Sequence, residues 1–195
     1  MNRKRVILVI LIVLSFQTGC LYAVRYDGPY HGKVVDEQTR EPIEGAVVLG
    51  QWGVYHFGVA GGYTTFYDAR EAVTDKNGEF MIPGQGLRIM TSVGPMGALI
   101  YKAGYTYYTT GSWDTLKTGM FSKEEVKWEG DLSIFPLRKL TESERKKDVN
   151  GSMMPLLPSV PWQKMISMTR EVNNELIFRG LQPYNIGPSK KGEDK

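Results

Sequence analysis

Residues 71–83 decide the fold, and they read EAVTDKNGEFMIP. Glu71 to Thr74 has the composition of a short strand, and Glu79 to Ile82 resumes that pattern. Between these two segments lies Asn77-Gly78, a dipeptide that is one of the strongest short signals for a hairpin turn. Pro83 then ends the second strand, because proline lacks the N–H group that a strand ladder needs. The stretch therefore predicts a β-hairpin.

The same pattern of short strands and turns continues on both sides of this stretch. We expect further strands at residues 30–38, 43–49, 98–109 and 130–140. Thr39-Arg40-Glu41-Pro42 is the polar turn between the first two. Many short strands with Gly-rich turns, and no helical period early in the chain, are typical of an antiparallel sandwich.

Three blocks of this region resemble the carboxypeptidase regulatory-like domain. They read GKVVD at 32–36, PIEGAVV at 42–48 and TDKNGEFMIP at 74–83, and KAGY follows at 102–105. The resemblance covers about residues 29–140. It implies a mainly β fold, an antiparallel seven-stranded transthyretin-like sandwich. Residues 51–70 are longer and more aromatic than the family pattern.

The C-terminal part has a helical character. Residues 141–182 form a predicted helical extension, in which Thr141 and Glu144 have the spacing of a capping box. A longer helix is expected from Trp162 to Arg179, with Gly180 as its stop. Its apolar stripe consists of Trp162, Met165, Ile166, Thr169, Val172, Leu176 and Phe178. This C-terminal α-helix should close an open face of the sandwich; docking to another envelope protein is the alternative. Residues 183–195 are expected to be a disordered tail.

Residues 1–19 have the pattern of an export signal. A basic head, Arg3-Lys4-Arg5, precedes an apolar core at 6–16, which is shorter than the ~20 residues of a spanning helix. Gly19 stands directly before Cys20, the only cysteine of the chain. An ordinary cleaved signal that leaves Cys20 as a free thiol is one reading of this pattern.

This N-terminus also resembles the lipobox of bacterial lipoproteins, although Gln17 stands where that family prefers Leu. The resemblance implies that Cys20 is lipidated and becomes the first residue of the mature protein. Residues 20–28 would then be a tether between the acyl chains and the sandwich. The expected location is the cell envelope, with lipid anchoring, and Leu21 after the Cys implies the outer membrane if the cell has one.

The composition excludes several classes of function. The 195-residue chain has 24 basic and 21 acidic residues, and the three basic residues of the signal account for the whole excess. A neutral mature chain has no basic field for phosphates, so we expect no nucleic-acid partner. Two His and no second Cys argue against a metal site, and no nucleophile motif such as Gly-x-Ser-x-Gly occurs. We expect neither an enzyme nor a cofactor.

Aromatic residues are the remaining candidates for a site. They gather in two Gly-rich regions, and the candidate ligand-binding residues are Trp52, Tyr55, His56, Tyr63, Phe66, Tyr67, Tyr108 and Trp113. Exposed rings on a β-sandwich can anchor a protein or stack on a sugar, whereas core packing is the simpler explanation. The sequence therefore favours a non-catalytic, membrane-anchored binding or assembly module, whose partner is another envelope protein or a glycan. A carbohydrate-binding module is the alternative.

Overall fold

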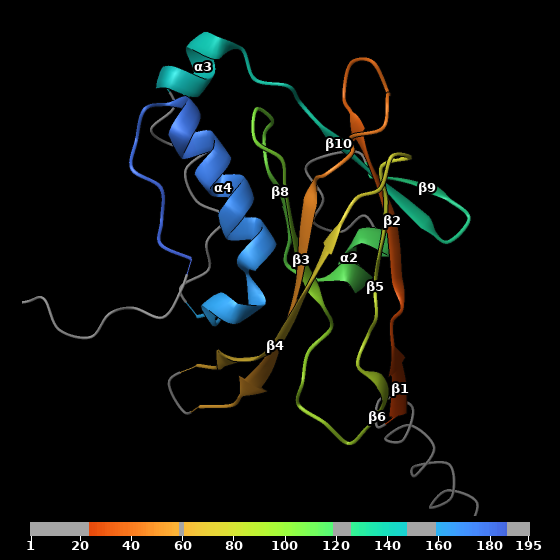
Figure 1. Ribbon diagram of the computed structural model, residues 1–195. Coiled ribbons are helices and arrows are strands. Elements are labelled where there is room, and N and C mark those ends of the chain that lie inside the picture. Colours follow the sequence, from red (N-terminus) through yellow and green to blue (C-terminus); the bar gives the residue numbers. More distant parts are fainter. Residues whose placement is uncertain (1–23, 59–60, 119–125, 148–158, 187–195) are drawn as a thin grey trace, which may run out of the picture.

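The protein is mainly β, with a C-terminal helix. The computed structural model describes residues 24–58, 61–118, 126–147 and 159–186. Within these ranges, ten strands form two four-stranded sheets and one two-stranded ribbon (Figure 1). The first sheet consists of β5 (Glu79–Ile82), β2 (Tyr30–Asp36), β10 (Leu132–Leu137) and β9 (Lys127–Glu129), in that order. The second consists of β4 (Tyr63–Val73), β3 (Val47–His56), β7 (Gly97–Tyr101) and β8 (Tyr108–Thr110).

The main core lies between the two four-stranded sheets. Val34 of β2 and Phe135 of β10 are fully buried on one side, and Ile100 of β7 is fully buried on the other. The short helix α2 (Trp113–Thr118) contributes Trp113, whose ring centroid lies 5.5 Å from that of Phe135. Alternate strand residues supply this core, because successive side chains point to opposite faces of a sheet.

A second core covers the outer face of the β4-β3-β7-β8 sheet. The C-terminal helix α4 (Ile166–Phe178) lies across this face, as Figure 1 shows in blue. Met168 and Val172 of the helix pack on Leu49 of β3 and Leu99 of β7. The sheet is therefore buried on both faces, which is why the start of β3 is apolar at successive positions instead of alternating. The expected closure of an open sheet face by this helix is confirmed, but the helix begins at Ile166 instead of Trp162, and Trp162 and Phe178 of the predicted stripe are exposed.

Specific contacts fix where α4 begins and where it ends. No side chain of its own caps the first turn; instead the Glu71 carboxylate of β4 accepts hydrogen bonds from the N–H groups of Ser167 (2.9 Å) and Met168 (2.6 Å). A carboxylate is favoured there by the unpaired N–H groups and by the helix dipole. At the other end, Gly180 has φ +72°, and Leu181 N–H bonds to the Leu176 carbonyl, as expected for a glycine stop.

The turn at 75–78 forms as expected, but the hairpin does not. Gly78 N–H donates to the Asp75 carbonyl (2.8 Å), and Gly78 has φ +74°. The flanking strands separate into different sheets, since β4 pairs with β3 and β5 pairs with β2. Thr74 Oγ1 is bonded to residues before β3, and the Gly78 carbonyl is bonded to Val34 of β2. These bonds outweigh the local pairing that Asn-Gly favours.

The prediction of an entirely antiparallel sandwich was wrong for one pair of strands. β10 runs parallel to β2, with Phe135 opposite Val34. A parallel partner needs a long crossover, and here the chain from β5 to β10 supplies it by passing through the second sheet and α2. Nothing in the composition of residues 130–140 distinguishes the two directions.

Several predicted boundaries also shift. The segment expected as one strand at 98–109 is two strands, β7 and β8. The predicted tether at 20–28 contains strand β1 (Val24–Asp27), which pairs with β6 (Gly86–Ile89). In the predicted tail, Tyr184 exchanges two hydrogen bonds with Asn173 of α4. The capping box forms as expected at α3 (Glu142–Lys147). Residues 1–19 and Cys20 lie outside the described residues.

Candidate functional site

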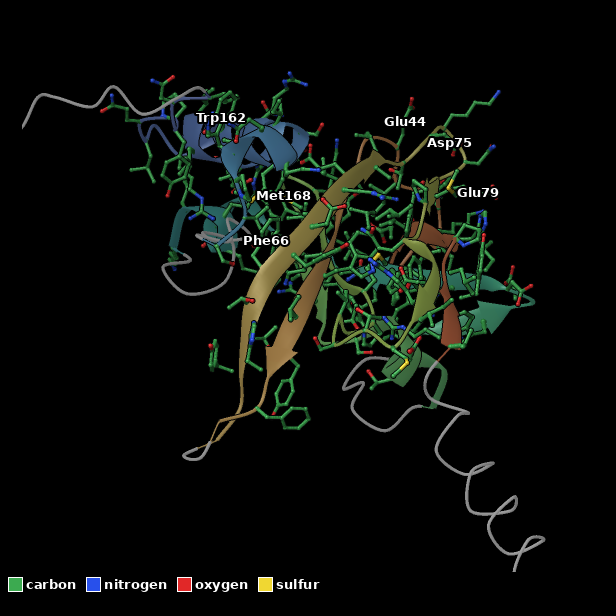
Figure 2. The ribbon with its side chains drawn as sticks, turned by 90° about the horizontal axis from the view of Figure 1, so that it is seen from below. Glu44, Phe66, Asp75, Glu79, Trp162 and Met168 are labelled. Carbon is green, nitrogen blue, oxygen red and sulfur yellow. The ribbon has the colours of Figure 1, made fainter. Side chains whose placement is uncertain are left out.

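The long β3–β4 hairpin projects beyond the sandwich (Figures 1 and 2). Its two strands stay paired from Val47–Val73 to His56–Tyr63, whereas β7 accompanies β3 only as far as Gln51. The outer half of the hairpin extends beyond the four-stranded sheet; its β3 edge pairs with residues 92–94 as far as Tyr55, and its tip projects past them. A bulge lies at the base of this half, where Trp52 opposes Asp68, Gly53 opposes Phe66, and Tyr67 has no partner in the register. Such a bulge bends a strand and re-aims the extra side chain.

Aromatic rings cover the outer half of the hairpin. Tyr55, Phe57, Tyr63 and Tyr67 are all exposed, and Phe57 has 90% of its surface in contact with solvent. The ring of His56 stacks on Tyr63 with centroids 4.8 Å apart, and Tyr55 meets Phe57 edge to face at the same distance. We call Tyr55, His56, Phe57, Tyr63 and Tyr67 the hairpin aromatics. They expose apolar area at low entropic cost, as binding surfaces often do.

A cavity of about 470 Å³ adjoins the hairpin aromatics. Its lining residues include the aromatic Tyr55 and Phe66 and the polar Gln51, Thr64, Thr65 and Ser112. A few hydroxyl and amide groups among aromatic faces are the combination that orients a polar ligand in a pocket.

A buried carboxylate fixes the base of the hairpin. Asp27 Oδ2 accepts hydrogen bonds from Trp52 Nε1 (2.9 Å) and the Gln85 N–H (2.8 Å), and Asp27 Oδ1 accepts one from Tyr30 Oη (2.7 Å). Burial, helped by the Asp27 carboxylate, raises the pKa of Tyr30 well above its ordinary value, so that its hydroxyl stays a donor. Trp52 is thereby held in the core, where Asp27 is also buried.

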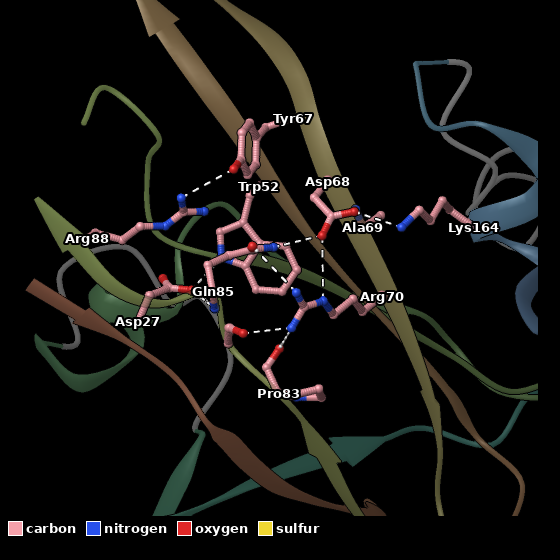
Figure 3. A network of polar contacts seen from close by, with 11 residues as sticks. Asp27, Trp52, Tyr67, Asp68, Ala69, Arg70, Pro83, Gln85, Arg88 and Lys164 are labelled. Atoms are coloured by element: carbon pink, nitrogen blue, oxygen red, sulfur yellow. Dashed lines mark hydrogen bonds and ion pairs between the residues drawn. The ribbon is translucent and has the colours of Figure 1, made fainter.

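A second carboxylate ties the hairpin to its neighbours (Figure 3). Asp68 of β4 accepts hydrogen bonds from Gln85 Nε2 (2.8 Å) and from Lys164 Nζ (2.9 Å) of the 3-10 helix η1 (Trp162–Lys164). Partial burial opposes ionisation of Asp68, but the hydrogen bonds from Lys164, Gln85 and the Ala69 N–H outweigh it and hold the pKa of this carboxyl below its ordinary value.

Two arginines add further hydrogen bonds at the base of the hairpin. We call the contacts made there by Asp27, Asp68, Arg70 and Arg88 the clamp. Arg70 donates to the carbonyls of Pro83 (2.7 Å) and Gly84 (2.6 Å), which lie between β5 and β6. Arg88 of β6 donates to Tyr67 Oη (3.2 Å) and lies over its ring, 5.0 Å from the centroid (Figure 3). The base of the hairpin is thus held from several sides while its outer rings remain exposed. A surface ordered in advance loses less entropy when it binds.

The structure divides the eight predicted aromatic residues into three groups. Tyr55, His56, Tyr63 and Tyr67 are on the projecting hairpin, and Phe66 is half-buried at its base against the second core. Trp52, Tyr108 and Trp113 are buried in the main core, so for these three candidates the core-packing explanation holds and an exposed binding face does not, although Trp52 also lines the cavity. Trp52 of β3, Tyr108 of β8 and Trp113 of α2 point into the main core.

Sequence reasoning missed the polar side of the site. Thr64, Thr65 and Gln51 line the cavity, and Arg88 holds Tyr67. The only signal for the two threonines was their place between Tyr63 and Phe66 in a strand that the sequence left unassigned. No local signal pointed to Arg88, because its partner is 21 residues away.

No helix within the described residues has the length and apolar character to cross a bilayer. In the same ranges, His, Cys, Asp and Glu side chains form no group of three or more that could hold a metal ion.

Comparison with known proteins found no matching family, no similar curated protein and no similar solved structure.

Proposed function

We propose that the protein is a non-catalytic, lipid-anchored binding or assembly module of the bacterial cell envelope, tethered at Cys20. The observation that carries this proposal is the projecting hairpin, with exposed rings outside and a clamp of hydrogen bonds at its base. A surface of this kind is built for contact with a partner, since four large aromatic side chains are otherwise costly to leave in water. The export signal with its single Cys supports the proposed location in the cell envelope.

We further propose that the two sheets are a transthyretin-like sandwich of the regulatory-like type. In support, the three sequence blocks meet in space. Val34 N–H bonds to the Gly78 carbonyl (2.8 Å), and Ile43 N–H bonds to the Val34 carbonyl (3.0 Å). Thr74 Oγ1 donates to the Ile43 carbonyl (2.6 Å), which closes the set. These hydrogen bonds between the three blocks would explain why the blocks occur together in the family pattern.

The non-catalytic part of the proposal is supported by the hydrogen bonds that already engage the buried and partly buried carboxylates. Asp27 and Asp68 are each engaged by three or more donors that hold the hairpin. Glu175 is engaged by two arginines and a backbone N–H group. Carboxylates in these roles position structural elements.

Photo-crosslinking in intact cells tests the binding proposal. A benzoylphenylalanine at position 57 should form an adduct with one recurring envelope protein, and Tyr63→Ser should abolish it. Tyr107→Ser is the control, because Tyr107 is an exposed tyrosine outside the hairpin, with 39% of its surface exposed against 60% for Tyr63. The proposal fails if the adduct is absent, or if the two serine variants reduce it equally.

A carbohydrate ligand is the second candidate, and the 470 Å³ cavity with its hydroxyl and amide lining favours it. The full chain should then bind envelope glycans on an array, and Tyr55→Ala should remove that binding while leaving the melting temperature unchanged. Binding that survives Tyr55→Ala would exclude the cavity as the site.

The anchor has its own test. Labelled palmitate should be incorporated into the wild-type protein and not into Cys20→Ser, and only the wild type should remain with the membrane after washing. Leu21 after the Cys supports an outer-membrane location in a cell with two membranes. A wild-type protein with a free Cys20 thiol would refute the anchor.

A further inference from the structure

The β1–β6 ribbon presents apolar side chains to the outside. The two strands pair antiparallel, with Val24 opposite Ile89 and Tyr26 opposite Leu87. All four of these side chains are more than half exposed, and Tyr26 reaches 72%. Met90, the next residue after β6, is 85% exposed. We call these five residues the ribbon face.

The opposite side of the ribbon carries the charges. Arg25 opposes Arg88 in the register, and both are turned towards the protein. Arg25 donates to the carbonyls of Val93 (3.0 Å) and Gly94 (2.7 Å), Arg88 is bonded to Tyr67, and Asp27 is buried. A sheet with one wet face normally places its apolar residues inward and its polar residues outward. This ribbon has the reverse arrangement.

The reversed arrangement is fixed by these contacts. Turning the ribbon over requires a slip of one residue, which would bring Val24 and Tyr26 inward and expose Arg25 and Asp27. Such a slip would break the hydrogen bonds of Asp27 with Tyr30, Trp52 and the Gln85 N–H. The protein is therefore built to keep the apolar side of the ribbon outward.

The position of the ribbon in the chain identifies what covers it. β1 begins four residues after Cys20, and four residues span at most about 14 Å. We infer that the ribbon face lies on the bilayer surface, with its apolar side chains at the boundary between headgroups and acyl chains. This inference rests on the proposed lipid anchor at Cys20. An apolar contact beside the acyl chains adds buried apolar area and therefore adds to the membrane affinity. Tyr26 is of a residue type enriched at that boundary.

The experiment uses the processed full chain, purified and reconstituted into phosphatidylcholine–phosphatidylglycerol vesicles. Leu87→Cys provides a single labelling site when Cys20 is acylated, because the chain has no other Cys. A polarity-sensitive nitrobenzoxadiazole probe at this position should shift its emission to shorter wavelength and lose most of its intensity when the vesicles contain doxyl-labelled lipid.

The matched control is Glu44→Cys, an exposed position in the loop between β2 and β3, which lies at the opposite end of the sandwich from the β1–β6 ribbon (Figure 1). Its probe should keep its emission and intensity in the same vesicles. A probe at position 87 that behaves like the probe at 44, on a chain whose mass shows acylated Cys20, overturns the ribbon proposal and assigns the face to a protein. An unmodified Cys20 in that mass spectrum instead refutes the anchor, and the ribbon proposal with it.

Discussion

At the scale of single residues, two tyrosines in similar surroundings have different energetic roles. Tyr30 and Tyr101 are both buried, and burial raises the pKa of each well above its ordinary value, so both hydroxyls are protonated at neutral pH. Tyr30 Oη donates to the Asp27 carboxylate. Tyr101 Oη has no hydrogen-bond partner among the described residues. A buried hydroxyl without a partner destabilises the folded state.

The same substitution should therefore have opposite effects at the two positions. We expect Tyr30→Phe to lower the free energy of unfolding by about 1.5–3 kcal/mol, because it removes a hydrogen bond to a charged group. We expect Tyr101→Phe to leave it unchanged or raise it by up to about 1 kcal/mol. Urea denaturation at pH 7 measures both. Equal losses would mean that the Tyr101 hydroxyl has a partner.

Residue identity alone did not separate binding aromatics from core aromatics. Trp52 and Tyr55 are three residues apart in one strand, yet Trp52 is buried beside Asp27 and Tyr55 is exposed. Alternation along β3 turns Trp52 into the main core and Tyr55 to the opposite face of the strand. Which face is buried at that point depends on contacts with distant segments, and the local sequence contains no record of those contacts. Cys20 remains a prediction from the sequence.

At the scale of elements, α4 packs on the sheet by its apolar side and is joined by a charged contact to α3 and to the loop after β7. Glu175 is 2% exposed; it accepts hydrogen bonds from Arg145 Nη2 (2.6 Å), Arg179 Nε (3.1 Å) and the Gly104 N–H (3.0 Å). Burial opposes ionisation of Glu175, but the hydrogen bonds and charges of the two arginines outweigh it and lower the pKa of its carboxyl.

This contact predicts a pH dependence of stability. With a lowered pKa in the folded state, the contribution of Glu175 is fully present above the unfolded value of about 4.3 and is lost as the pH falls through the lower folded value. Glu175→Gln should lower the free energy of unfolding at pH 7 by about 3–5 kcal/mol, because it leaves two arginines without their partner. The difference between variant and wild type should shrink towards pH 2.

Denaturation at several pH values checks this expectation. Glu142→Gln is the control, because Glu142 also has a lowered pKa, through its hydrogen bond with Lys146, but the pair is exposed to solvent. An exposed pair contributes little. A difference between Glu175→Gln and the wild type that stays constant from pH 7 to pH 2 would contradict the assigned role.

Elements with a strong local signal could be predicted from the sequence, and elements defined by distant partners could not. The capping box at Thr141 and the stop at Gly180 are local, and both formed where expected. β1 and β6 have only four residues each and exist because they pair across about 60 positions of chain. In both strands the apolar side chains face outward, which is the opposite of the arrangement from which the buried side of a strand is normally predicted.

At the scale of the whole molecule, the protein has three layers, which are two sheets and α4. Val172 of α4 is 1% exposed and packs against the second sheet. We expect Val172→Asp to lower the free energy of unfolding by at least about 4 kcal/mol, because it buries an unpaired charge. Ile177→Asp on the solvent side of the same helix is the control and should have a small effect.

Circular dichroism during thermal unfolding distinguishes these variants.

A chain that ends at Ser159 should aggregate or unfold, since it exposes the apolar face formed by Val47, Leu49 and Leu99. If that shortened chain stayed folded and lost only a binding partner, α4 would be a docking helix and the sandwich would be complete without it.

The ribbon face and the hairpin aromatics lie towards the same end of the molecule (Figure 1). They are physically joined, because Arg88 of the ribbon holds Tyr67 of the hairpin. With the ribbon on the bilayer, the partner of the hairpin would be met close to the membrane surface. The anchor, the ribbon and the hairpin would then act as one membrane-proximal unit.

The parallel pairing of β2 with β10 determines when the first sheet can be completed during synthesis. β2 is among the first strands to leave the ribosome, but its neighbour on one side is encoded about 100 residues later. Until Leu132–Leu137 emerges, β2 has an open edge, and contacts between such distant segments form slowly. The nascent chain thus stays without a finished sheet for most of translation, which is the form that a secretion channel would require if the proposed export signal directs it there.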